Sequence, residues 1–314
     1  MSSLITVLEL IIFIGTGVLI WKLGIFSDNS LKDLSTFLID IVIPCTIVQS
    51  MQVPFSVEQL KNGLTMILLG ALSIAISGLT AFAISRPKGI ARNDRAMIMA
   101  GGTFMNYSFL GFPVMQALYG DNGLFLASMN VIIIRILYFV CTPFLLTGTK
   151  SSKEDTLRSI RKTLISPPII SVFLGFVLFL SGVQIPNVFL TPIKTVSDMT
   201  TPLGLIICGM SIAKIKINKT FHWNALVSVL LCRNLLSPLF YLVIAIILGV
   251  SGLPLEVSTM ITALPVGSLI TTFCIQAGQD DCTAGTMVLC STILSIVTIP
   301  LLTLLFTALP GICA

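Results

Sequence analysis

The stretch Gly101-Gly-Thr-Phe-Met-Asn-Tyr-Ser-Phe-Leu-Gly-Phe-Pro113 places helix-breaking and polar residues in the middle of a long apolar segment. Proline removes a backbone hydrogen bond, and glycine permits an unwound path. At membrane depth, backbone freed from a helix is tolerated only inside protein or along a water-filled cavity. The stretch therefore predicts a broken helix that lines a site. An ordinary proline kink with local side-chain hydrogen bonds is the alternative. The candidate site residues here are Asn106, Tyr107, Ser108, Gly111 and Pro113.

The composition of the whole chain is that of a protein embedded in lipid. Of its 314 residues, 55% are hydrophobic and only 10% are charged, and the mean hydropathy is +1.03. A soluble domain is about one quarter charged, so this chain lacks the polar residues to coat a water-facing surface. The composition excludes a soluble enzyme and a nucleic-acid-binding module. It predicts an all-α polytopic membrane protein.

Hydropathy divides the chain into ten expected transmembrane helices, each near the roughly 20 residues that cross a bilayer. They lie near residues 4–24, 31–52, 63–85, 95–118, 122–147, 163–182, 190–213, 223–249, 255–277 and 282–308. A basic linker, 149–162, separates five spans in residues 1–148 from five in residues 163–314. Lysine and arginine gather in the loops after spans three, five and seven, which the positive-inside rule places in the cytoplasm. Both termini are therefore expected on the extracytoplasmic side of the cell membrane.

The two halves resemble each other at an offset of 158 residues. The matched pairs are Gly17 and Gly175, Gly24 and Gly182, Asp40 and Asp198, Pro44 and Pro202, and Gly120 and Gly278. Most single identities at this rate arise by chance, but the shared Asp-x-x-x-Pro combines two residue types that are costly in hydrocarbon. An odd number of spans per half forces the second copy to be upside down, as in many secondary transporters. We therefore predict two inverted five-helix repeats.

A second interrupted segment lies in span nine. Proline and glycine again interrupt an apolar span, and hydroxyl and amide side chains follow; the candidates are Pro265, Gly267, Ser268, Thr272 and Gln276. Strict alignment at 158 residues places Pro113 opposite Thr271, so the two breaks are not expected to coincide. Paired interrupted spans in corresponding places nevertheless point to a binding site near the bilayer midplane.

Charged residues within the expected spans are further candidates, because each costs on the order of 2.5–3.5 kcal/mol at a helix centre and should face protein or water. Arg135 in span five and Arg233 in span eight are suited to bind a carboxylate through two parallel hydrogen bonds. The alternative is that each arginine pairs within the protein or extends to the membrane surface. The acidic candidates for proton or ion coupling are Glu9, Asp40 and Asp198. Packing beside prolines is the alternative for the two aspartates.

No motif indicates an enzyme, a metal or a cofactor. The eight cysteines are scattered singly, and His222 has no cysteine or histidine neighbour, so no metal site is expected. The sequence Gly148-Thr-Lys-Ser lacks the preceding glycine pattern of a phosphate-binding loop. The expected function is that of a secondary transporter. An anion channel and a membrane sensor that does not transport are the alternatives.

Several segments resemble the auxin efflux carrier family, which includes plant PIN carriers and bacterial organic-acid permeases. The similar segments are residues 106–114 with Leu118-Tyr-Gly120, residues 202–212, residues 264–273 and residues 291–301. The chain has no long central loop, so it is similar to the compact microbial members.

This resemblance implies ten spans in two inverted repeats, with spans four and nine crossing at their breaks. It implies a scaffold of spans one, two, six and seven that forms a homodimer, and a mobile domain made of the rest. It also implies elevator-like transport of a small organic anion, such as malate, malonate or an auxin-like weak acid. The residues that the resemblance places at the substrate are Asn106, the break at Pro113, Pro265, Val266, Asn130 and Tyr138.

Overall fold

A computed structural model describes residues 2–87, 90–147, 157–158, 161, 163–215 and 222–308. Every regular element in these ranges is a helix. Five stretches are long and apolar enough to cross a membrane: Val57–Ser85, Tyr107–Leu146, Asn187–Lys214, Trp223–Ile247 and Cys282–Ala308. The prediction of an all-helical membrane protein is thus confirmed, and the count of ten spans stays a prediction. Most of the predicted linker 149–162 lies outside the described residues.

The helices form two compact units, each assembled from separate parts of the chain. Unit 1 comprises Met1–Leu68, Tyr107–Ile132 and Lys162–Lys214, and unit 2 comprises Leu69–Asn106, Ile133–Arg161 and Ile215–Ala314. Both units draw on both halves of the sequence. The predicted repeats, residues 1–148 and 163–314, are therefore different from the two compact units.

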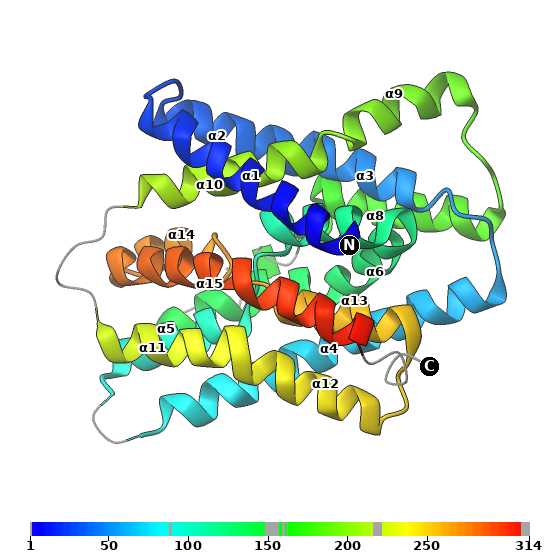
Figure 1. The fold of residues 1–314 in the computed structure, drawn as a ribbon. Coiled ribbons are helices and arrows are strands. Elements are labelled where there is room, and N and C mark those ends of the chain that lie inside the picture. The colour runs from blue at the N-terminus through cyan, green and yellow to red at the C-terminus, as the bar shows by residue number, and fades with distance from the viewer. Residues whose placement is uncertain are drawn as a thin grey trace. The chain divides into compact units, whose positions relative to one another are not determined.

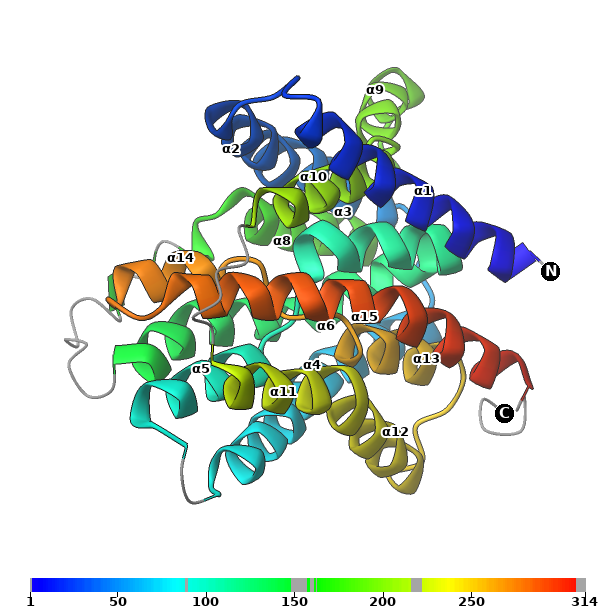
Figure 2. The same ribbon diagram turned by 60° about the vertical axis from the view of Figure 1, so that its left-hand side comes forward.

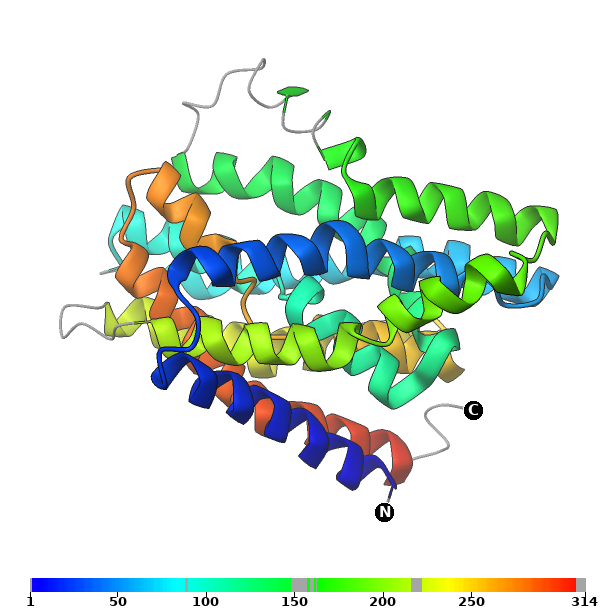
Figure 3. The same ribbon diagram turned by 90° about the horizontal axis from the view of Figure 1, so that it is seen from above.

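Unit 1 is built around a close pair of helices, α1 (Ser2–Lys22) and α10 (Thr200–Lys214), which lie side by side (Figures 1 and 3). A Cβ on Gly17 would lie 2.1 Å from the carbonyl oxygen of Ile206, and a Cβ on Gly209 would lie 2.0 Å from that of Ile14. These glycines therefore allow the two backbones to touch, which is the usual way that helices associate tightly in membranes.

The other elements of unit 1 pack against α10 and against one another. They are α2 (Asp28–Phe37), η1 (Leu38–Val42), α3 (Ile43–Ser50), η2 (Tyr107–Gly111), α8 (Pro167–Ser181), α9 (Asn187–Ser197) and the first parts of α4 (Val57–Ser85) and α6 (Phe112–Thr147). The π-helical turn η1 continues α2 into α3. Pro44 therefore lies within a continuous helix, and the π-helical turn directly before it is where the regular hydrogen-bond pattern changes.

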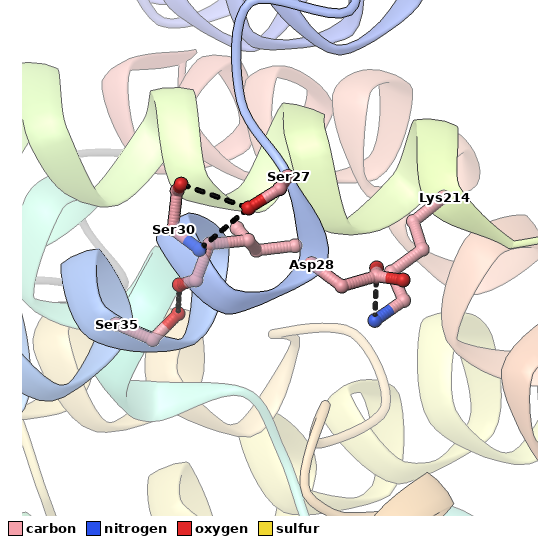
Figure 4. Close-up of polar contacts among 6 residues, drawn as sticks. Ser27, Asp28, Ser30, Ser35 and Lys214 are labelled. Carbon is pink, nitrogen blue, oxygen red and sulfur yellow. Dashed lines mark hydrogen bonds and ion pairs between the residues drawn. The ribbon is translucent and has the colours of Figure 1, made fainter.

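Polar contacts join the start of α2 to the end of α10 (Figure 4). The Ser27 hydroxyl caps α2 by accepting a hydrogen bond from the Ser30 N–H at 3.2 Å. Lys214 Nζ lies 2.6 Å from Asp28 Oδ1, and both side chains are about half or more exposed. Exposed ion pairs contribute at most about 1 kcal/mol, so this pair orients the helix ends more than it stabilises them.

Unit 2 packs the remaining helices around one apolar core. Figure 2 shows α11 beside α5 and α15 along α14. The elements are α5 (Arg92–Thr103), α11 (Trp223–Leu231), η3 (Cys232–Leu236), α12 (Ser237–Ile247), α13 (Gly252–Thr262), α14 (Ile270–Gln276) and α15 (Asp281–Ala308), with the rest of α4 and α6. Met97, Val229 and Met287 are buried in this core from three different helices.

The first chain break lies before the position expected from the sequence. Helix α5 ends at Thr103, and Phe104 is extended with φ −106° and ψ 133°. Pro113 instead lies inside the continuous helical stretch Tyr107–Leu146, just after the π-helical turn η2 passes into α6. The prediction of a break at Pro113 is therefore wrong. The boundary expected between spans four and five falls at Gly120, where non-helical backbone with φ 60° and ψ −151° separates two helical parts of α6.

Backbone features recur between the halves at almost the predicted offset. The helical stretches that follow the two breaks begin at Tyr107 and Ile270, an offset of 163 residues. The helices that precede them end at Thr103 and Thr262, an offset of 159. Two matched glycine pairs, Gly24 with Gly182 and Gly120 with Gly278, all have φ between 60° and 69°. Pro113 and its 158-residue counterpart Thr271 both lie inside helices, so the expectation that the two breaks are out of register stays a prediction.

Candidate functional site

The candidate site is the point in unit 2 where the two chain breaks lie against each other. The Asn106 N–H donates to the Pro265 carbonyl oxygen at 2.8 Å, and the Gly267 N–H donates to the Phe104 carbonyl oxygen at 3.1 Å. Met105 lies opposite Val266 in an antiparallel bridge, and both residues are fully buried. Each break thus provides hydrogen-bond partners for backbone groups of the other. Backbone that is buried and not helical needs such partners.

Helix α15 supports the second break through a serine that sequence reasoning did not select. The Ser291 hydroxyl accepts a hydrogen bond from the Val266 N–H at 3.1 Å. The Ser291 carbonyl accepts one from Asn234 Nδ2 at 3.0 Å. The signal for both residues is polarity within an apolar span: Ser291 is followed by Thr292, and Asn234 is adjacent to Arg233.

Arg233 lies in η3, and its fully buried side chain donates only to backbone carbonyls. Its Nη1 atom lies 3.1 Å from the Gly102 oxygen and 2.9 Å from the Thr103 oxygen, at the end of α5. Its Nε atom lies 3.1 Å from the Leu264 oxygen, and its Nη2 atom donates to the Thr262 oxygen at the end of α13. The last carbonyls of a helix have no partner within that helix. Arg233 thus fits the alternative of an arginine paired within the protein.

Tyr138 of α6 packs its ring directly over the crossing. The ring stacks on Phe104 with centroids 4.8 Å apart and meets the edge of Phe273 at 5.8 Å. A Cβ on Gly267 would lie 2.6 Å from the Tyr138 hydroxyl oxygen and 3.2 Å from the Met105 oxygen. Residue 267 is therefore glycine because the buried phenol leaves no room for a side chain.

Replacing Gly267 with alanine should lower the stability of the protein by about 1–3 kcal/mol, because overpacking a buried site forces its neighbours to move. Adding Tyr138→Phe should restore part of this loss by removing the nearest atom. Gly101→Ala is the matched control, since its Cβ would meet Val229 and Ile270 at 3.4–3.6 Å, an ordinary contact distance. Thermal unfolding of wild type and the three purified variants measures the effect. Equal melting temperatures for Gly267→Ala and Gly101→Ala would contradict the packing argument.

Arg135 is the second buried cation of unit 2 and lies one helical turn from Tyr138. Its side chain is 7% exposed, and its Nε atom has no hydrogen-bond partner among the described residues. Its guanidinium carbon lies 5.7 Å from the centroid of the Phe139 ring. Residues three apart share one helix face, so Arg135 and Tyr138 point in similar directions. A buried guanidinium with a spare donor is suited to an anionic ligand.

Other predicted site residues belong to unit 1. Tyr107 and Gly111 are buried in η2 and Ser108 is half-buried there, while Pro113 is the second residue of α6. A Cβ on Gly204 of α10 would lie 2.8 Å from Pro113 Cγ. Asn130 is fully buried, and its Nδ2 atom donates to the Met66 oxygen at 2.9 Å. Its Oδ1 atom has no hydrogen-bond partner in the described chain.

The remaining candidates are less enclosed. Ser268 is half-buried and accepts a hydrogen bond at its carbonyl from Thr271, whereas the side chains of Thr272 and Gln276 are exposed on α14. Glu9 and Asp198 are also exposed, and Asp40 is half-buried in η1. None of these three acids forms an ion pair with another described residue. No group of metal-binding side chains occurs in the described ranges.

Comparison with known proteins supports the family resemblance. Residues 2–303 match the profile of the family described as membrane transport protein. The chain is 24% identical over 306 residues to an uncharacterized transporter of Methanothermobacter thermautotrophicus, covering 96% of this chain and 97% of that protein. It is 22% identical over 269 residues to an uncharacterized transporter of Methanocaldococcus jannaschii, covering 82% and 84%. Because the family match includes both breaks and nearly the whole chain, this multi-pass protein belongs to the membrane transport protein family, the auxin efflux carriers that its motifs resemble.

Proposed function

We propose that the protein is a secondary transporter that binds a small organic anion beside the crossing of its two chain breaks. The observation that carries this proposal is the antiparallel contact of Met105 and Val266, flanked by the two backbone hydrogen bonds of Asn106 and Gly267. Discontinuous helices that meet in this way form the substrate sites of many secondary transporters.

Two buried positive charges in unit 2 favour an anion. Arg135 and Arg233 are both more than nine-tenths buried, and neither forms an ion pair with a described acidic side chain. A buried positive charge without an acidic partner is costly, and an anionic ligand offsets that cost. Since Arg233 is occupied by carbonyls, Arg135 is the residue that we expect to contact a carboxylate. Tyr138, on the same face, is placed to bind beside it.

The packing of the crossing favours a carrier over an open channel. Met105, Val266 and Tyr138 are at most 2% exposed, so within unit 2 the breaks enclose no open path. A carrier needs such a closed site because it exposes its substrate to one side at a time. Elevator-type motion, a homodimer and a location in the cell membrane with both termini outside are parts of this proposal.

The inverted repeat is a further part of the proposal, with spans in residues 1–148 and 163–314. Its support is the recurrence, near 158 residues, of the helix ends Thr103 and Thr262 and of the left-handed glycines Gly120 and Gly278. These features depend on the backbone and not on the choice of apolar side chain. If each half is a copy of one five-helix unit, these backbone features recur because both copies have the same fold.

Counterflow of labelled dicarboxylates in proteoliposomes tests the function. We expect saturable counterflow of malate or malonate, and about tenfold weaker apparent affinity in Asn106→Ala, because a lost hydrogen bond to a charged group costs about 1.5 kcal/mol or more. Asn122→Ala is the matched control, since Asn122 is exposed and pairs with Gln59. Currents far above carrier turnover would favour a channel, and ligand binding without flux would favour a sensor. Absence of both binding and flux for all carboxylates tested would refute the proposal.

A further inference from the structure

Four backbone carbonyls converge on one buried side chain at the crossing. The oxygens of Gly102 and Thr103 come from the end of α5, and those of Thr262 and Leu264 come from the end of α13 and the residues after it. Helix C-termini carry partial negative charge, and here two of them point at the same place. Such a cluster of carbonyl oxygens needs hydrogen-bond donors and favours a cation.

Exchangeable metal ions serve as this cation in many transporters with broken helices, where unwound carbonyls and helix C-termini coordinate Na⁺. In this protein the Arg233 guanidinium already occupies the carbonyls. We propose that Arg233 is a built-in cation that holds the two breaks together in place of an exchangeable metal ion. If the proposed function is correct, the site then binds its organic anion without Na⁺.

The local backbone is shaped to deliver this side chain. Cys232, Arg233 and Asn234 are consecutive and all buried, although three successive residues of a regular helix point in directions about 100° apart. The π-helical turn η3 widens the helix at this point, which is a frequent feature of functional sites. It allows Arg233 to reach both breaks while Asn234 reaches Ser291.

Arginine suits the role because its charge is permanent and its donors are fixed in one plane. A bound Na⁺ ion comes and goes with its concentration, whereas this charge stays in every state of the transport cycle. The crossing therefore remains positive when it is empty. This property favours entry of an anion and removes the need for a second ion to prepare the site.

The test compares melting temperatures of purified protein in NaCl and in choline chloride. The melting temperature of wild type should be the same in NaCl and in choline chloride. The same should hold for Arg233→Lys, which keeps the charge, whatever its own melting temperature is. Arg233→Ala should melt lower in choline chloride and recover by about 3 °C at Na⁺ concentrations tenfold above its dissociation constant, since the freed carbonyls would bind the ion. Asn234→Ala is the matched control; it loses a buried hydrogen bond beside Arg233 but no cation, so its lower melting temperature should not respond to Na⁺.

The wild-type measurement decides the proposal even where Arg233→Ala fails to fold. A Na⁺-dependent rise in the melting temperature or counterflow rate of wild type would overturn it, as would a folded Arg233→Ala variant that ignores Na⁺. Equal counterflow of wild type in both salts supports it. Absence of counterflow in either salt would refute the proposed transport function, while the melting temperatures would still test the built-in cation.

Discussion

Replacing Gly17 with alanine should unfold unit 1, whereas the same change at Gly15, two residues earlier on α1, should leave the protein folded. The added Cβ of Gly17→Ala would lie 2.1 Å from a backbone oxygen of α10, which cannot rotate away, so the helices must separate. We expect a loss on the order of 3 kcal/mol or more, at the upper end for overpacking. A Cβ on Gly15 would meet no atom within 4 Å, and alanine raises helix propensity by up to about 1 kcal/mol.

Size-exclusion chromatography in detergent and thermal unfolding measure this difference. Gly209→Ala, which adds a Cβ on the opposite helix, should behave like Gly17→Ala. A monodisperse Gly17→Ala protein that melts with wild type would show that α1 and α10 do not pack as described.

Removal of the Arg135 charge should cost most of the affinity for dicarboxylates. In Arg135→Gln we expect dicarboxylate binding to weaken by roughly 100-fold, the loss for a charge-assisted hydrogen-bonded pair of about 3 kcal/mol. Monocarboxylate binding should weaken less, because a single carboxylate can retain its other contacts. Arg135→Lys should also lose affinity despite its charge, since lysine cannot form two parallel hydrogen bonds.

Competition binding on purified protein provides the measurement, and Arg86→Gln serves as the control. Arg86 lies over the ring of Phe82 at the end of α4, so it resembles Arg135 in stacking on an aromatic ring, but its side chain is exposed. Equal affinities of wild type and Arg135→Gln for every carboxylate would leave Arg135 with a structural role only.

The sequence predicted which spans are interrupted but not where the chain unwinds. Prolines and glycines drew attention to residues 101–113 and 263–276, and both segments do contain a break. The first break falls at Phe104–Asn106, where Phe104 and Met105 carry no local signal against helix. Their extended backbone is stabilised by Pro265 and Gly267, about 160 residues further along the chain. Pairing over such a distance is invisible to helix propensity.

The role of Arg233 was equally hidden. The sequence predicts that Arg233 binds a carboxylate of the substrate, because a charged residue within an apolar span is expected to face protein or water. Its four acceptors belong to residues 102–103 and 262–264, so only the folded chain shows that backbone carbonyls take its donors. Arg135 differs because its Nε atom keeps a vacant donor among the described residues. Two arginines with the same sequence signature thus have different environments.

The bridge between the breaks also limits how the two extended segments can move relative to each other. Sliding one break along the other by a single residue would turn Met105 or Val266 to the opposite side of the extended chain and separate both flanking hydrogen bonds. The two breaks therefore cannot shift along each other in small steps, because even a shift by one residue disrupts the contact. In the transport cycle that we propose, the two extended segments therefore move together as one rigid part, and the displacement of the substrate across the membrane takes place by sliding at other surfaces.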